Sequence, residues 1–158
     1  MHISFLGYAD AAYKNRDDNK STTGYVFIAA GGAITWQSSR QSVTAESSTE
    51  AEYITLWEAR KKASWLRNLY NKLGFTQKEP TVIMQDNTRM VAIVKNPMFH
   101  KCTKHINSHF HWIREKIQDG RLDTEICHTD EQTADALTKS LAHPKHNKHL
   151  KAMGLLPV

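Results

Sequence analysis

Apolar residues in the first forty positions are grouped in runs that favour β-strands. The segments HISFLGYAD (2–10), GYVFIAA (24–30) and AITWQSS (33–39) are rich in β-branched and aromatic residues, and Gly31-Gly32 separates the last two as a hairpin turn. The segment KNRDDNKST (14–22) between the first two is polar and typical of turns. Short connections of this kind predict an antiparallel meander of three strands.

A helical period follows from Ser47 onward. Apolar residues recur every three or four positions at 56, 59, 63, 66 and 73, which predicts one long amphipathic helix. Ser47 and Glu50 have the spacing of a capping box, which marks the start of the helix, and Gly74 supplies a stop.

The second half of the chain alternates between short apolar runs and helical patterns. We predict strands at TVIMQD (81–86) and LDTEICHT (122–129), and helices over 88–95, 106–118 and 131–141. Strands separated by helices pair in parallel, so the chain is predicted to be an α/β protein with a mixed sheet flanked by helices. The predicted domain covers residues 1–142, and residues 143–158 form a basic C-terminal tail.

Composition narrows the possible functions. The chain has 158 residues, which fits one domain. Its composition, 40% hydrophobic and 23% charged residues, excludes a disordered chain. No apolar run approaches the roughly 20 residues of a membrane span, and we expect no secretory signal and no membrane association. The net charge of +5 favours a polyanionic partner. Cys102 and Cys127 match no metal-binding spacing and are expected to be free thiols.

One acidic residue stands on the apolar stripe of the long helix. Glu52 lies four positions before Leu56 and should face the sheet, whereas Glu50 points to solvent. A buried carboxylate needs a partner, and a salt bridge to a lysine or arginine is one solution.

The other solution is a cation shared with further carboxylates. Asp10 and Asp86 end predicted strands, and Asp135 lies in the last predicted helix. Two unit charges 4 Å apart repel by about 4 kcal/mol at an effective dielectric constant near 20, so a cluster needs bound cations or protonation. Oxygen ligands favour Mg²⁺ or Mn²⁺.

Several motifs resemble a known family. The sequence is similar to the ribonuclease H domain at the C-terminal end of copia-type retrotransposon polyproteins. The matching segments, which occur in the family's order, are GYADAAY (7–13), KSTTGYVF (20–27), ITWQSSRQ (34–41), SSTEAEYITL (47–56), QDN (85–87), NPMFHKCTKHI (96–106), HFHWIRE (109–115) and EQTADALTKSL (131–141).

The resemblance implies a ribonuclease H-like fold with a five-stranded mixed sheet, and an endonuclease that hydrolyses the RNA strand of RNA–DNA hybrids during reverse transcription. It also implies that Asp10, Glu52, Asp86 and Asp135 are the catalytic residues and the ligands of two Mg²⁺ (or Mn²⁺) ions. Asp10 would bridge both ions, Asp86 and Asp135 would serve the nucleophile side, and Glu52 the leaving-group side. No small-molecule cofactor is expected.

The same resemblance suggests contacts and partners. Nucleic acid is expected to contact Ser38, Arg40, Gln41, Ser48, Thr49, Lys104 and His105. His128 is the nearest equivalent of a histidine that assists product release. The expected partners are the hybrid and the reverse transcriptase domain of the same polyprotein, in cytoplasmic virus-like particles.

Two alternatives stay open at this point. The chain could be a catalytically weak or inactive ribonuclease H-like module that binds nucleic acid or supports a reverse transcriptase. A zinc site formed by His105, His109 and His111 is not favoured, because no fourth ligand has a matching spacing. The four tryptophans, at 36, 57, 65 and 112, are expected to pack in or beside the core.

Overall fold

Five strands form one mixed sheet at the centre of the protein. The computed structural model describes residues 3–15, 17–96 and 120–155. The strands are β1 (Phe5–Ala12), β2 (Thr22–Ala29), β3 (Gly32–Arg40), β4 (Thr81–Gln85) and β5 (Leu122–Ile126), in the spatial order β3-β2-β1-β4-β5. Neighbours among the first three strands are antiparallel, whereas β4 runs parallel to β1 and β5 parallel to β4. The predicted meander with parallel additions is confirmed.

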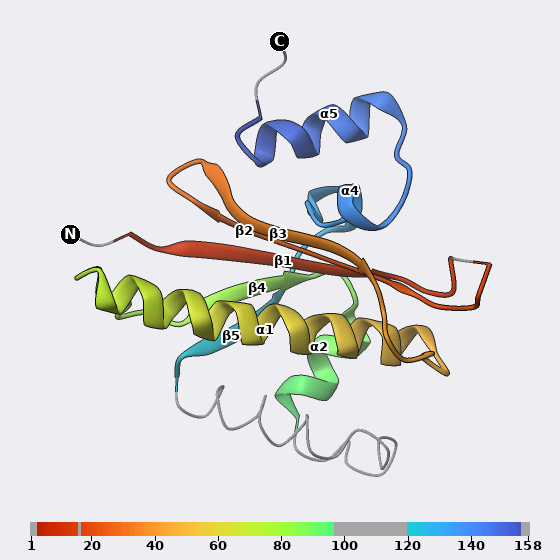
Figure 1. The fold of residues 1–158 in the computed structure, drawn as a ribbon, viewed down its shortest axis with the longest axis horizontal. Coiled ribbons are helices and arrows are strands. Elements are labelled where there is room, and N and C mark those ends of the chain that lie inside the picture. Colours follow the sequence, from red (N-terminus) through yellow and green to blue (C-terminus); the bar gives the residue numbers. More distant parts are fainter. Residues whose placement is uncertain (1–2, 16, 97–119, 156–158) are drawn as a thin grey trace.

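Helices cover both faces of this sheet. Figure 1 shows α1 (Ser48–Lys72) and α2 (Thr88–Lys95) on one side, and α4 (Asp135–Thr138) and α5 (His143–Ala152) on the other. The 3-10 turn η3 (Thr129–Glu131) precedes α4. The predicted helix over 106–118, together with Cys102, Lys104, His105, His109, His111 and Trp112, lies outside the described residues.

Helix α1 begins where the sequence predicted. The Ser47 hydroxyl accepts a hydrogen bond from the Glu50 backbone N–H at 3.1 Å, and the Glu50 carboxylate accepts one from the Glu46 N–H at 2.7 Å. Fixing the first turn also fixes the direction of every later side chain. Leu56, the first large member of the apolar stripe, is fully buried against the sheet.

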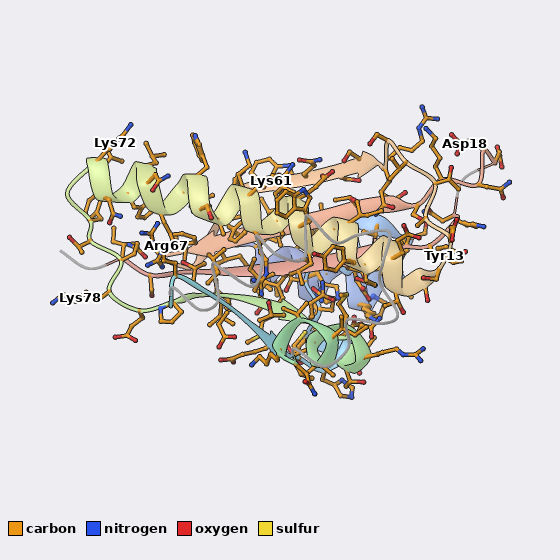
Figure 2. All side chains as sticks on the ribbon, turned by 90° about the horizontal axis from the view of Figure 1, so that it is seen from below. Tyr13, Asp18, Lys61, Arg67, Lys72 and Lys78 are labelled. Atoms are coloured by element: carbon orange, nitrogen blue, oxygen red, sulfur yellow. The ribbon has the colours of Figure 1, made fainter. Side chains whose placement is uncertain are left out.

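The core lies between α1 and the sheet. It contains side chains from β1, β2, β4, β5, α1 and α2. Its buried members include Phe5, Ala9, Tyr25, Phe27, Leu56, Ala59, Ala63, Leu66, Ile83, Met90 and Leu122. Within residues 3–15, 17–96 and 120–155, no helix is long and apolar enough to span a membrane. Figure 2 shows α1 crossing the sheet from Tyr13 and Asp18 at one end to Lys72 and Lys78 at the other.

The last predicted helix is shorter in the structure than the pattern over 131–141 indicated. Gln132 explains the difference, because its buried side chain donates to the Ala9 carbonyl at 3.0 Å and accepts from the Ala134 N–H at 3.3 Å. Local side-chain bonds of this kind compete with helical ones. They hold the segment before α4 against β1.

Helix α5 was not predicted and lies within the basic C-terminal segment. His149 and Met153 are buried, and the Ala33 N–H of β3 donates to the Met153 carbonyl at 2.8 Å. Lys148 pairs with Glu131 of η3. These contacts hold α5 and the residue after it against β3 and η3.

Two tryptophans correct the expectation of packing in or beside the core. Trp36 is 62% exposed and Trp65 is 55% exposed. Trp36 lies on the outward face of β3, which is an edge strand, and Trp65 lies on the outward face of α1. Trp57 packs against the core as expected.

Candidate active site

Three acidic side chains from distant parts of the chain meet at one edge of the sheet. Asp10 lies near the end of β1, Asp86 directly follows β4, and Glu52 lies in the second turn of α1. One oxygen from each carboxylate lies within 4.8 Å of the others. Because β1 and β4 are parallel neighbours, their carboxyl ends meet at the same edge, and the capped start of α1 brings Glu52 to that point.

Burial makes this cluster electrostatically costly. Burial raises the pKa of the Glu52 carboxyl well above its usual range, and the charges of Asp10 and Asp86 raise it further, against a hydrogen bond from the Ala11 backbone. Burial also raises the pKa of Asp10, although the Thr138 hydroxyl and Lys139 act in the opposite direction. Two acids that resist ionisation therefore lie side by side.

Among the described residues, Glu52 forms no ion pair with a base. Its Oε2 atom is buried without a hydrogen-bond partner, and none of the ion pairs among the described residues includes this carboxylate. The salt-bridge solution weighed for Glu52 is therefore absent from the part of the chain that the structure describes.

Asp135, the fourth predicted acid, is instead paired with lysines. Its Oδ1 lies 3.0 Å from Lys139 Nζ, and its Oδ2 lies 3.3 Å from Lys145 Nζ. Lys139 Nζ also lies 3.5 Å from Asp10 Oδ2, so this ammonium joins the fourth acid to the first. Asp135 is 1% exposed but is not among the three carboxylates that converge.

Close packing of α4 on β2 places Asp135 and Thr138 beside Asp10. Gly24 pairs with Asp10 across the β1–β2 register, and a Cβ at Gly24 would collide with the Thr138 side chain. The Thr138 hydroxyl donates to Asp10 Oδ2. The absence of a side chain at Gly24 is what allows this approach.

The residues expected to contact nucleic acid differ in their exposure and in their local partners. Ser48 is exposed and Thr49 half-buried at the start of α1, and Arg40 is exposed and pairs with Asp18 at 2.7 Å. The Ser38 hydroxyl donates to the Leu137 carbonyl at 2.6 Å.

Gln41 and His128 also have defined local partners. Gln41 is buried, and its amide donates to the Ala51 carbonyl at 2.9 Å, which gives it a structural role at the start of α1. His128 is exposed, and its Nδ1 accepts from the Asp130 N–H at 3.2 Å before η3.

Sequence comparison finds relatives along nearly the whole chain. The chain is 42% identical over 150 residues to the retrovirus-related Pol polyprotein from transposon TNT 1-94 of Nicotiana tabacum. This alignment covers 94% of the chain and 11% of the polyprotein. It is also 34% identical over 157 residues to the retrovirus-related Pol polyprotein from transposon RE2 of Arabidopsis thaliana. That alignment covers 99% of this chain and 11% of the polyprotein. No family model matches the sequence.

The chain is homologous to a segment of the Pol polyproteins of copia-type plant transposons. It spans about a tenth of the length of these relatives. The resemblance stated from the motifs is therefore confirmed.

Solved structures agree on the fold. The N-terminal RNase H domain of rv2228c from Mycobacterium tuberculosis superimposes with a TM-score of 0.61 at 14% identity, covering 95% of this chain and 98% of that one. LC11-RNase H1, solved in complex with an RNA/DNA hybrid, gives a TM-score of 0.60 at 15% identity, covering 85% and 94%. The fold of this Pol homologue is that of ribonuclease H.

The three converging carboxylates fit a divalent cation. The donor set consists of oxygen atoms, which hard cations such as Mg²⁺ and Mn²⁺ prefer. The unpartnered Glu52 Oε2 is a buried acceptor for which a cation would compensate.

Four residues that support the acids were not predicted from the sequence. Thr138 and Lys139 follow Asp135 by three and four positions on one helical turn, so helical spacing was a usable signal. Lys145 and Gln132 reach the site through tertiary packing, and no local pattern indicated them.

Proposed function

We propose that this Pol homologue is a divalent-cation-dependent ribonuclease H that hydrolyses the RNA strand of RNA–DNA hybrids during reverse transcription. The ribonuclease H fold and the homology to transposon Pol polyproteins support the reaction class. The observation that carries the proposal is the convergence of the Asp10, Glu52 and Asp86 carboxylates, together with the buried Glu52 Oε2, for which the described part of the chain supplies no hydrogen-bond donor.

Each acid has a place in the proposed site. Asp10, Glu52 and Asp86 would hold the catalytic cations. Asp135 would be the fourth ligand, although Lys139 lies between it and Asp10 in this structure. Bound divalent cations supply Lewis-acid stabilisation of the phosphate and a water of lowered pKa. The protein fixes the ligands beforehand, because the Thr138 hydroxyl orients Asp10 and the Ala11 backbone bonds to Glu52.

The hybrid is proposed to approach across the exposed start of α1. Ser48 and Thr49 lie there, and short hydroxyl side chains suit contacts to ribose 2′-hydroxyls in the minor groove, by which proteins distinguish RNA from DNA. The exposed Arg40 is proposed to contact phosphate after release from Asp18. The buried Gln41 would act indirectly by holding α1.

The proposed setting follows from the relatives. We propose that the domain acts with the reverse transcriptase part of a Pol polyprotein, inside cytoplasmic virus-like particles. A polyanionic substrate is consistent with the net charge of +5.

A cleavage assay tests the proposed function. With Mg²⁺, the protein is expected to cut the RNA strand of a labelled RNA–DNA hybrid but neither strand of a DNA duplex, and a chelator should stop the reaction. Asp86→Asn should lower the rate by about a hundredfold or more, because it removes a charged ligand of the cation. Asp17→Asn, an equal change in charge in an exposed turn, serves as the control.

The assay separates the two functional classes. If the unmodified protein retards the hybrid in a gel but never cuts it with Mg²⁺ or Mn²⁺, the chain is a binding module. Equal cleavage rates for the protein and Asp86→Asn would contradict the assignment of the site.

A further inference from the structure

We propose that Lys139 and Lys145 are resident counter-ions of the carboxylate site, which hold Asp135 and Asp10 in the cation-free protein and compete with divalent cations for them. The proposal rests on the cation site proposed above. It assigns to two lysines a direct control over how tightly that site binds its ions.

Lys139 is placed between the two acids that it neutralises. Its Nζ lies 3.0 Å from Asp135 Oδ1 and 3.5 Å from Asp10 Oδ2, while both carboxylates are almost completely buried. Asp10 is also one of the three acids that converge as candidate cation ligands. The same oxygen-rich region is therefore shared by an ammonium group and by the proposed cation.

Lys145 approaches Asp135 from the other side and from a different helix. Its Nζ lies 3.3 Å from Asp135 Oδ2 and 3.7 Å from Asp130 Oδ1. With Lys139 on Oδ1, both oxygens of this buried carboxylate face lysines. This arrangement explains why Asp135 stands apart from the group formed by the other three acids.

Helix α5 is anchored firmly enough to hold Lys145 at this point. His149 and Met153 are buried beneath the helix, and the Met153 carbonyl accepts from Ala33 of β3. The approach of Gly154 to Gly31 is so close that a Cβ could not be accommodated. Figure 1 shows α5 lying over α4, on the opposite side of the sheet from α1.

The charges are placed where screening by water is incomplete. The side chains of Lys139 and Lys145 are 42% and 31% exposed, whereas those of Asp10 and Asp135 are 3% and 2% exposed. A lysine that neutralises a buried carboxylate lowers the attraction of that carboxylate for an incoming cation. Removal of the lysine should leave the cluster more negative, and it should then bind divalent cations more tightly.

The test is the affinity for Mn²⁺, measured by titration calorimetry on the full chain without nucleic acid. We expect Lys139→Met to tighten Mn²⁺ binding by about tenfold and Lys145→Met by about threefold, an effect limited by the partial exposure of both lysines. Lys148→Met is the matched control, because it makes the same change in charge on α5 but, among the described residues, removes a pair with Glu131 rather than with Asp10 or Asp135. Its affinity should stay within about twofold of the unmodified protein.

A double-mutant cycle shows whether Lys145 acts through Asp135. In an Asp135→Asn background, Lys145→Met should no longer change the Mn²⁺ affinity, since the carboxylate that it releases is gone. Lys145 lies on a different helix from Lys139, so its variant gives an independent result if Lys139→Met disturbs α4.

The outcomes distinguish this inference from the proposed function. Equal or weaker Mn²⁺ binding by Lys139→Met and Lys145→Met, relative to Lys148→Met, would overturn the role of the lysines and leave the cation site intact. Absence of Mn²⁺ binding by the unmodified protein and all variants would overturn both.

Discussion

Glu52→Gln is expected to abolish hybrid cleavage while it stabilises the cation-free protein. Replacement of a charged ligand by a neutral amide should lower the cleavage rate by about a thousandfold, because the cation loses a ligand in the transition state. The same change removes a buried carboxylate whose Oε2 has no partner and which Asp10 and Asp86 repel. We expect a gain of about 1 kcal/mol in the free energy of unfolding in a chelating buffer at neutral pH.

The stability gain should depend on pH with a defined sign. The pKa of Glu52 is raised in the folded protein above the unfolded value, so the folded state retains a proton that the unfolded chain has lost. The carboxyl is neutral in both states below about pH 4, where the variant and the parent should differ little. The advantage of Glu52→Gln should grow as the pH rises through the unfolded value, as measured by thermal unfolding in a chelating buffer.

Added Mg²⁺ should reverse this advantage. A ligand that binds only the folded state stabilises it, so the parent should gain melting temperature with Mg²⁺ and the variant should gain little. Glu50→Gln, the same substitution two positions earlier on α1, is the control and should retain cleavage, because Glu50 is half-buried outside the acidic cluster and a Gln oxygen can still accept from the Glu46 N–H. A Glu52→Gln protein that cuts the hybrid at the parental rate would refute the role of this carboxylate.

Gly24→Ala is expected to damage the site from the opposite face of the sheet. The new Cβ would lie closer than 3.0 Å to the Thr138 side chain, and α4 would have to move away from β2. That movement breaks the hydrogen bond from Thr138 to Asp10 and shifts Asp135. We expect a loss of about 1–3 kcal/mol in unfolding free energy and a roughly 100-fold lower cleavage rate.

Two other glycines separate the effect on stability from the effect on the site. Gly7→Ala would bring a Cβ within 2.6 Å of the Phe27 ring in the core, so it should lower stability yet leave the cleavage rate of the folded protein nearly unchanged. Gly32→Ala meets no atom within 4 Å and should change neither. If Gly24→Ala lowers the melting temperature as Gly7→Ala does but cleaves at the parental rate, α4 does not position the acids.

The fold could be predicted from the sequence in those elements whose apolar pattern matches the side chains that they bury in the core. The five strands, α1 and α2 were predictable because alternating or helical apolar positions become the core, and because Ser47 and Asn87 cap their helices as their sequence context indicated. Glu52 was identifiable because a charged residue on an apolar stripe violates the pattern.

The residues that escaped prediction depend on contacts between distant segments. Helix α5 carries few apolar residues, and it is held by lysine–carboxylate pairs and two buried side chains that no periodicity reveals. Gln41 was expected to contact nucleic acid, yet it is buried and its amide donates to the Ala51 carbonyl. The division of the four acids into a converging three and a lysine-bound Asp135 likewise required the tertiary structure.

The central claim is that Asp10, Glu52 and Asp86 share divalent cations. A crystal structure of the protein soaked in Mn²⁺, with anomalous diffraction recorded, measures this most directly. We predict an anomalous peak within about 2.0–2.5 Å of oxygens from all three carboxylates. Well-ordered carboxylates at 10, 52 and 86 with no peak between them, at a Mn²⁺ concentration that supports activity, would contradict the account.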